Sequence, residues 1–289
     1  MDLNVPDRRS TLSNEVYEEV QTVSEKLDKM RLSGEDQKIL DWLSPLPDPS
    51  RSTGEQERRQ TGTGTWFLTT PEYVRWRDGG SPTLLCPGIP GAGKTVMSTF
   101  VLDDLWQQYG ARDDICILNL FCNFRLTNEQ TLVKLLCSLV RQAVERSPAV
   151  PAALRTLHEG HKHRQTRPDL DQLKNTLTQI LVPTTRTYIV LDALDECRND
   201  DRTLDCLLEA LFQIQTQLHD QVSLLATTRF IPGILDQFGH VPRLEIRADD
   251  TDVRRYLDSQ MSRLPRQVAG NVAFCNEIKD KIIECVEGM

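Results

Sequence analysis

Three absences narrow the class of protein before any motif is considered. None of the eight cysteines forms a C-x-x-C pair, the spacing of many zinc sites and dithiol redox centres. No apolar run approaches the roughly 20 residues of a membrane-spanning helix, and no apolar stretch near the amino end has the form of a secretory signal. Acidic residues exceed basic ones by 42 to 34, so the basic face typical of nucleic-acid binding is not expected.

These absences lead us to expect a cytoplasmic protein with no membrane partner and no nucleic-acid partner. Several cysteines, such as Cys116 and Cys137, fall in apolar patterns and are expected to be small buried hydrophobes in a reducing compartment. Cys197 follows directly after an acidic pair, and a redox role for this thiol is a minor alternative.

The residues that are present have the composition of a globular α/β protein. With 289 residues, of which 39% are hydrophobic, the chain is long enough for one large α/β domain and helical flanks. Apolar runs alternate with helical patterns and no internal repeat is visible, which favours a doubly wound, mainly parallel sheet between two helical layers. Strands are expected near 83–86, 115–121, 187–192, 222–228 and 243–246, and helices near 94–109, 129–146, 169–181 and 203–218.

Two helices are expected ahead of this core. An apolar stripe over 14–30 predicts the first, which we expect to pack on the main domain, with docking of a partner as the alternative. The second is expected over 35–43, because Ser33 and Asp36 have the spacing of a capping box. The basic segment 152–168 holds three of the five histidines and is interpreted as a solvated connection rather than a metal site.

One motif carries most of the functional information. The apolar run Thr83 to Cys86 leads into a G-x-x-x-x-G-K-T sequence that a helical pattern follows, which is the strand–loop–helix context of a P-loop. The glycines let backbone N–H groups turn toward a polyphosphate, Lys94 reaches its β- and γ-phosphates, and the Thr95 hydroxyl holds Mg²⁺. The predicted contacts to the nucleotide are Gly88, Ile89, Pro90, Gly91, Ala92, Gly93, Lys94, Thr95 and Val96.

An acidic cluster supplies the second half of the predicted site. The uninterrupted apolar run from Tyr188 to Leu191 predicts a buried parallel strand, with Asp192 at its carboxyl end as a Mg²⁺ ligand. Glu196 is predicted to orient and deprotonate an attacking water, with Asp195 supporting it. The alternative is that Asp195 and Glu196 only cap the helix that follows.

Arg229 stands after the next predicted strand, where its guanidinium can contact the γ-phosphate. The alternative for this residue is an ordinary surface arginine in a loop.

Together these motifs resemble the NACHT domain, and the chain is most similar to the nephrocystin-like NACHT NTPases. The resemblance rests on 88–95 (GIPGAGKT), 192–196 (DALDE) and 227–230 (TTRF), and it covers roughly 34–289. It implies five parallel strands, with the strand that ends near Arg229 between the P-loop strand and the strand of Asp192. It also implies that 59–67 lies over the base, with Thr63, Gly64 and Trp66 as candidate contacts; Trp66 is equally expected as a core anchor.

The resemblance divides the chain into N-terminal helices at 1–48, a linker and base lead-in at 49–80, the NTPase core at 81–247 and the incomplete start of a helical domain at 248–289. Such proteins act as nucleotide-dependent switches. The expected ligands are therefore Mg²⁺ and a nucleoside triphosphate, hydrolysed slowly to control signalling or oligomerisation, with self-association or association with other NACHT proteins.

ATP is favoured over GTP because no N/T-K-x-D element follows the P-loop. The alternative function is a catalytically inactive nucleotide-binding scaffold, or a regulatory fragment of longer NACHT proteins. A small-molecule kinase is disfavoured, since no arginine-rich lid follows the acidic cluster.

Overall fold

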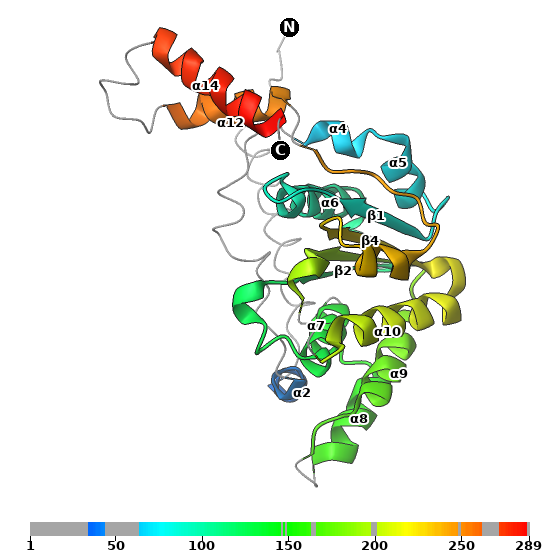
Figure 1. Cartoon of the computed structure of the whole chain (residues 1–289). Coiled ribbons are helices and arrows are strands. Elements are labelled where there is room, and N and C mark those ends of the chain that lie inside the picture. Colours follow the sequence, from blue (N-terminus) through cyan, green and yellow to red (C-terminus); the bar gives the residue numbers. More distant parts are fainter. Residues whose placement is uncertain are drawn as a thin grey trace, which may run out of the picture.

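The computed structural model describes residues 34–43, 64–145, 147, 149–162, 166–197, 201–247, 250–261 and 272–287. The helix expected over 14–30 and the part of the linker and base lead-in at 49–63, Thr63 included, lie outside these residues. Figure 1 shows the described core as a central sheet with helices against both of its faces, which confirms the predicted α/β class.

The sheet has four parallel strands rather than the predicted five. The strands are β1 (Thr83–Pro87), β2 (Ile115–Phe121), β3 (Arg186–Asp192) and β4 (Val222–Thr228). Their order is β1-β4-β3-β2, so β4 lies between the P-loop strand and the strand of Asp192, as the family resemblance implied. Apolar residues predominate in the four strands, and every strand residue but one is buried, because helices cover both faces.

The predicted fifth strand is present only as a segment that runs along β1. Leu85 N donates to Pro242 O over 3.1 Å, and Leu244 N donates to Leu85 O over 2.9 Å, which forms one parallel bridge to Arg243. A second bridge would need an N–H at position 87, but Pro87 has none, so it only accepts a bond from Ile246 N, at 2.8 Å. The ladder therefore stops after one pair.

Alternating residues of β3 pack into two separate hydrophobic cores. Tyr188 and Val190 face a core formed with α4 (Thr65–Leu68), α5 (Pro71–Arg77) and α6 (Lys94–Tyr109). Ile189 and Leu191 face the opposite core, formed with α7 (Leu132–Glu145), α9 (Leu170–Leu181) and α10 (Thr203–Gln217). This is the three-layer α/β/α arrangement (Figure 1). The remaining described elements are η2 (Phe124–Leu126), α8 (Ala152–Lys162), η3 (Leu194–Glu196), η4 (His219–Gln221), α11 (Pro232–Leu235) and η5 (Asp236–Phe238).

Helix α2 (Gly34–Leu43) confirms the second predicted helix. Asp36 is buried and accepts a hydrogen bond from Arg155 Nη2 on α8 at 2.5 Å, so its carboxylate forms an ion pair with that helix; Ser33, its predicted capping partner, lies outside the described residues.

The interpretation of 152–168 as a solvated connection was wrong for most of its length, because α8 covers Ala152–Lys162. Its histidines contact α2: the rings of Trp42 and His158 lie edge to face with centroids 5.1 Å apart. Leu154 is fully buried and anchors α8 in the core. The polar composition hid an amphipathic helix.

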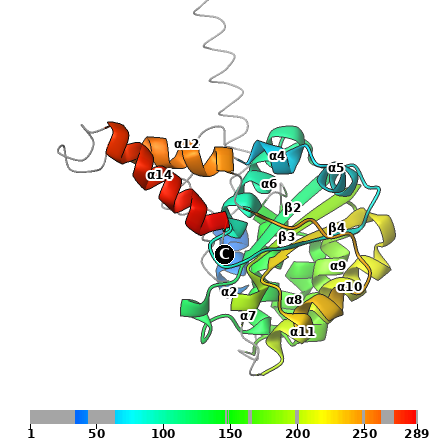
Figure 2. The same cartoon turned by 45° about the horizontal axis from the view of Figure 1, so that its top comes forward.

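Helices α12 (Asp250–Met261) and α14 (Val272–Glu287) lie side by side at one end of the domain (Figure 2). Ion pairs join them: Arg254 to Asp280 at 3.0 Å and Lys279 to Asp258 at 2.7 Å. Both fall in the segment expected to begin a helical domain. Over the residues that the structure describes, no helix is long and apolar enough to cross a membrane.

Candidate functional site: the P-loop and the carboxyl edge of the sheet

The loop between β1 and α6 has the open form that a phosphate group requires. Gly91 and Gly93 adopt φ angles of +81° and +87°, a region that L-residues with a Cβ avoid. A Cβ added to either glycine would meet no atom within 4 Å, so the space beside the loop is empty. The helix begins at Lys94, and its first N–H groups have no carbonyl partner within the helix.

Gly88 is needed for a different reason from the one that the sequence predicted. Its backbone is not in the left-handed region, but a Cβ at this position would lie 2.6 Å from the carbonyl oxygen of Ile246. The residues that flank β1 therefore pack directly on the start of the loop. Gly88 N also donates to Thr228 O over 3.0 Å, which connects the loop to the end of β4.

The Lys94 side chain folds back over the loop that precedes it. Its Nζ donates to the carbonyl oxygens of Gly88, at 3.0 Å, and Ile89, at 2.9 Å. Partial burial lowers the pKa of Lys94, and the charges of Asp195 and Asp192 oppose that shift. The ammonium group thus lies inside the loop, where the carboxylates of Asp195 and Asp192 act on it.

Asp192 lies at the end of β3 with 1% of its surface exposed. Its Oδ1 accepts hydrogen bonds from Ser98 Oγ at 2.6 Å and from Thr227 Oγ1 at 2.7 Å, and Thr95 is a third hydroxyl partner of the carboxylate. Burial raises the pKa of Asp192, whereas these hydroxyl groups and the charge of Lys94 lower it. The structure thus brings together Thr95 and Asp192, the two predicted Mg²⁺ ligands.

The chain turns sharply after Asp192. Ala193 has a φ of 53°, unusual for a residue with a Cβ, and its N–H donates to Thr227 Oγ1 over 2.9 Å. The 3-10 turn η3 follows and holds Asp195 and Glu196. Helix α10 begins only at Thr203, so the alternative that the acidic pair caps that helix was wrong.

Asp195 and Arg229 form an ion pair across the ends of β3 and β4. Asp195 accepts a hydrogen bond from Arg229 N over 3.0 Å and another from Arg229 Nε. The Asp195 side chain is 2% exposed, whereas the Arg229 side chain is 46% exposed. The hydrogen bond and charge of Asp195 raise the pKa of the guanidinium. Arg229 is therefore anchored at the site rather than loose in a surface loop.

Glu196 lies next to this pair. Its Oε2 accepts a hydrogen bond from the backbone N–H of Phe124 over 3.3 Å, which connects the acidic turn to η2 after β2. The side chains named for catalysis, Glu196, Asp195 and Arg229, thus lie at the carboxyl ends of the neighbouring strands β3 and β4.

Sequence reasoning missed two features at this edge. Ser98 lies one helical turn after Lys94, but nothing in the local pattern indicates that it reaches Asp192. Cys122 lies against Cys197; its hydrogen bond to that residue and its burial raise its pKa well above the ordinary value. A raised pKa disfavours the reactive thiolate, so the pair has the character of core thiols.

The base lead-in ahead of α5 makes an unexpected long-range contact. Gly64 N donates to Asp252 Oδ2 on α12 over 2.7 Å. Trp66 is partly buried against the core that contains α6, with its ring 5.6 Å from that of Phe67. Its indole Nε1 is buried with no hydrogen-bond partner. This packing favours the core-anchor interpretation of Trp66.

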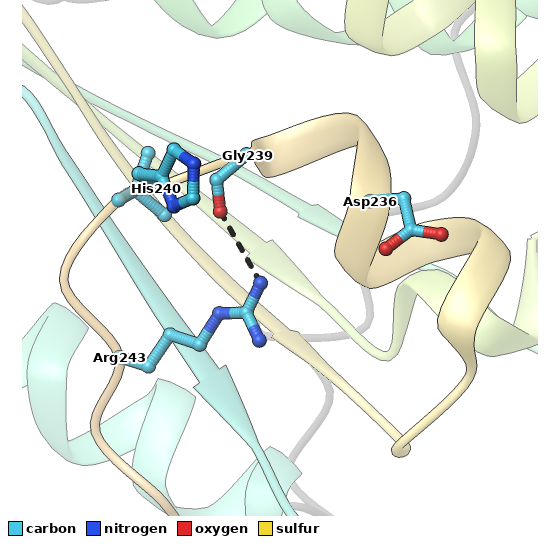
Figure 3. Close-up of a pocket in the computed structure, with 5 residues that line it drawn as sticks. Asp236, Gly239, His240 and Arg243 are labelled. Atoms are coloured by element: carbon cyan, nitrogen blue, oxygen red, sulfur yellow. Dashed lines mark hydrogen bonds between the residues drawn. The ribbon is translucent and has the colours of Figure 1, made fainter.

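A separate surface hollow of about 600 Å³ lies beside the segment that flanks β1 (Figure 3). The Arg243 side chain points toward Gly239 and donates from Nη2 to Gly239 O over 3.2 Å (Figure 3). No residue predicted from the sequence to bind phosphate or metal lines this hollow, which is formed by Asp236, Gly239, His240, Val241 and Arg243.

The residues of the loop and the acidic turn fit a magnesium nucleotide. Mg²⁺ prefers one or two protein oxygen ligands together with phosphate oxygens and water, and Thr95 and Asp192 supply a hydroxyl and a carboxylate side by side. The open space beside Gly91 and Gly93 admits the phosphates that would complete such a site. A glycine loop between β1 and α6, with an acidic residue at the end of a nearby parallel strand, defines the P-loop NTPase fold.

Comparisons with known proteins give the family. Residues 62–229, more than half of the chain, match the family described as "Nephrocystin 3, N-terminal". The chain belongs to this family of nephrocystin-like NACHT proteins, as the motifs predicted. It is 25% identical over 227 residues to the vegetative incompatibility protein HET-E-1 of Podospora anserina, an alignment that covers 74% of this chain and 16% of that protein.

Among solved structures, the chain is similar to domain III of the Thermotoga maritima replication initiation protein DnaA. That match has 13% identity and a TM-score of 0.39, and covers 78% of this chain and 80% of the other. The match to Cdc6p of Pyrobaculum aerophilum has 15% identity and a TM-score of 0.43, and covers 77% of this chain and 52% of the other.

Proposed function

We propose that this protein binds a nucleoside triphosphate with Mg²⁺, hydrolyses it slowly and uses the two nucleotide states as a switch that controls signalling or oligomerisation. The observation that carries the proposal is the meeting of Lys94, Thr95 and Asp192 beside an open glycine loop. ATP is the favoured nucleotide, since no guanine-reading N/T-K-x-D element follows the loop.

The phosphates are held by the loop from Gly88 to Val96. Lys94 is poised for this role because its ammonium already lies within the loop, at hydrogen-bond distance from two of its carbonyl groups. Thr95 and Asp192 would hold Mg²⁺, which supplies charge neutralisation for the phosphate oxygens. Lys94 adds a second positive charge that stabilises the charge developing on the γ-phosphate.

Glu196 is proposed as the base that orients and deprotonates water. Its Oε2 accepts a hydrogen bond from the Phe124 N–H, which gives the carboxylate a defined position, and its charge acts on Lys94 of the phosphate loop. Asp195 is proposed to support the site by holding Arg229, whose half-exposed guanidinium would offset phosphate charge; its charge already acts on Lys94 of the loop.

The switch is proposed to act in the cytoplasm through self-association or association with other NACHT proteins. We propose that residues 81–247 form the NTPase core of this switch and that residues 248–289 begin a helical domain. Vegetative incompatibility is the role printed in the name of the fungal relative, of which this chain covers 16%. The similarity to this relative supports the proposed signalling role only for the segment that the two chains share.

The test is nucleotide binding by a Lys94→Ala variant. Removing the ammonium is expected to weaken the binding of a fluorescent ATP analogue by at least tenfold while leaving the melting temperature near that of the wild type. Lys174→Ala is the matched control, because Lys174 binds Asp171 and Gln213 on the surface of α9 and α10. Undiminished affinity in Lys94→Ala would exclude the proposed site.

The second candidate is a scaffold that binds nucleotide without turnover. The ion pair between Asp195 and Arg229 favours it, because in this arrangement the arginine is engaged by a carboxylate. Phosphate release separates the two functions: the switch releases phosphate over hours at saturating ATP and Mg²⁺, whereas the scaffold retains intact ATP.

A further inference from the structure

Two hydroxyl groups from different elements hold one oxygen of Asp192. Ser98 donates from α6 and Thr227 donates from the end of β4, at 2.6 and 2.7 Å, and both bonds end on Oδ1. Ser98 and Thr227 are fully buried and Asp192 is 1% exposed, so bulk water does not compete for these bonds. Hydrogen bonds to a charged acceptor in such a setting are among the stronger ones in proteins.

The number of hydrogen bonds that a carboxylate can accept indicates which oxygen of Asp192 remains for a cation. An ionised carboxylate offers about four acceptor positions, two on each oxygen. Ser98 and Thr227 occupy both positions on Oδ1. Oδ2 is therefore the oxygen that remains for a cation, beside Thr95, the third hydroxyl partner of the carboxylate and the other predicted Mg²⁺ ligand.

The direction of the Thr227 bond is fixed by its surroundings. Ala193 N donates to Thr227 Oγ1 over 2.9 Å, so the hydroxyl proton of Thr227 is directed to Asp192. Its neighbour Thr228 follows in the strand and therefore faces the opposite side of the sheet, where its buried hydroxyl has no partner. Of the two consecutive threonines, only Thr227 serves the carboxylate.

Ser98 makes a bond that a serine within a helix seldom makes. Such a serine commonly donates to the carbonyl four residues earlier, as Ser138 does to Lys134 O at 2.9 Å on α7. Ser98 instead reaches a residue 94 positions away in the sequence. The α6 backbone thereby connects the phosphate loop directly to the end of β3.

We propose that Ser98 is a positioning residue for the divalent cation: together with Thr227 it fixes Asp192 through Oδ1 and reserves Oδ2 for the metal. The inference rests on the proposed function, since the metal arrives with the nucleotide. Groups that orient a metal ligand in this way typically contribute about 10- to 100-fold to metal affinity. Because Thr227 also holds Asp192, we expect the loss of the Ser98 hydroxyl alone to lower metal affinity by an amount near the lower end of that range.

The experiment measures binding of a non-hydrolysable ATP analogue while Mg²⁺ is titrated, and again in EDTA. Ser98→Ala is expected to raise the Mg²⁺ concentration for half-maximal binding about tenfold and to leave affinity in EDTA within about twofold of wild type. Ser138→Ala, the same substitution at a serine bonded to its own helix, is expected to match the wild type.

Thr227 provides an independent pair of variants. Thr227→Val removes the hydroxyl and is expected to shift the Mg²⁺ requirement in the same direction, whereas Thr227→Ser keeps the hydroxyl and is expected to restore it. If Ser98→Ala does not fold, this pair decides the question with the same measurement.

The outcomes separate the inference from the function on which it rests. A wild type that needs Mg²⁺ for tight binding, with an unchanged requirement in Ser98→Ala and Thr227→Val, overturns the inference and leaves the function standing. An equal loss of affinity with and without Mg²⁺ also overturns it, because that pattern indicates a structural role. A wild type that binds no nucleotide in either condition overturns both.

Discussion

Gly88→Ala tests whether the phosphate loop depends on its close packing against the backbone of Ile246. The added Cβ would lie 2.6 Å from Ile246 O and 3.5 Å from the Cβ of Ala92. The obstacle is the backbone carbonyl of Ile246, a residue whose N–H donates to Pro87 O over 2.8 Å; the segment is thereby held against β1, and a backbone group cannot swing aside as a flexible side chain would. Either the segment that flanks β1 or the start of the loop has to move.

The expected cost follows from two opposing contributions. Inserting a methyl group into a packed site costs about 1–3 kcal/mol. Replacing glycine reduces the entropy of the unfolded chain, which returns about 0.4–1 kcal/mol. The net loss of stability is therefore about 1–2 kcal/mol, or roughly 2–4 °C in melting temperature for a chain of this size.

The assay is thermal and urea unfolding of the nucleotide-free protein, with Gly160→Ala as the control. Gly160 lies exposed in α8, where an added Cβ meets no atom within 4 Å, so alanine there is expected to stabilise by about 0.5–1 kcal/mol. The two substitutions should thus change the free energy of unfolding in opposite directions. Wild-type stability in Gly88→Ala, or a loss of stability in Gly160→Ala, would refute the packing argument.

Three further predictions concern the acidic turn. Asp192→Asn is expected to stabilise the metal-free protein: burial raises the folded-state pKa of Asp192, so its ionisation costs stability as pH rises from the unfolded value of about 4 through the folded value. Urea unfolding at several pH values should show Asp192→Asn more stable than the wild type at high pH and equally stable at low pH. A gain in stability confined to low pH would contradict a raised pKa. Glu196→Gln is expected to keep nucleotide affinity but slow phosphate release about 100-fold or more, and unchanged turnover removes Glu196 as the base. Arg229→Ala is expected to destabilise by about 1–2 kcal/mol, because the buried carboxylate of Asp195 loses its partner. Adding Asp195→Asn should recover part of that loss, and strictly additive effects would show that the pair is not coupled.

The features that could be predicted from the sequence are those set by local patterns. The P-loop is contiguous, and its strand, glycine turn and helix each have a short-range signal, as the bounds of β1 and α6 confirm. The placement of β4 between β1 and β3 came from the family resemblance, since strand order depends on contacts that periodicity does not reveal.

The features that were missed depend on distant residues or on a single backbone atom. The fifth strand was expected near 243–246, in line with the five strands that the family resemblance implied, but the absent N–H of Pro87 ends its pairing. Ser98 and Asp192 meet only through tertiary folding, as do Asp195 and Arg229. Helix α8 was missed because its polar surface dominates its composition.

The most direct test of the central claim is calorimetric titration of ATP into folded protein that has been stripped of bound nucleotide, with saturating Mg²⁺ and again in EDTA. The account predicts one binding event per chain in Mg²⁺, weaker binding in EDTA and loss of the signal in Lys94→Ala. No heat for ATP or GTP under any of these conditions would contradict it.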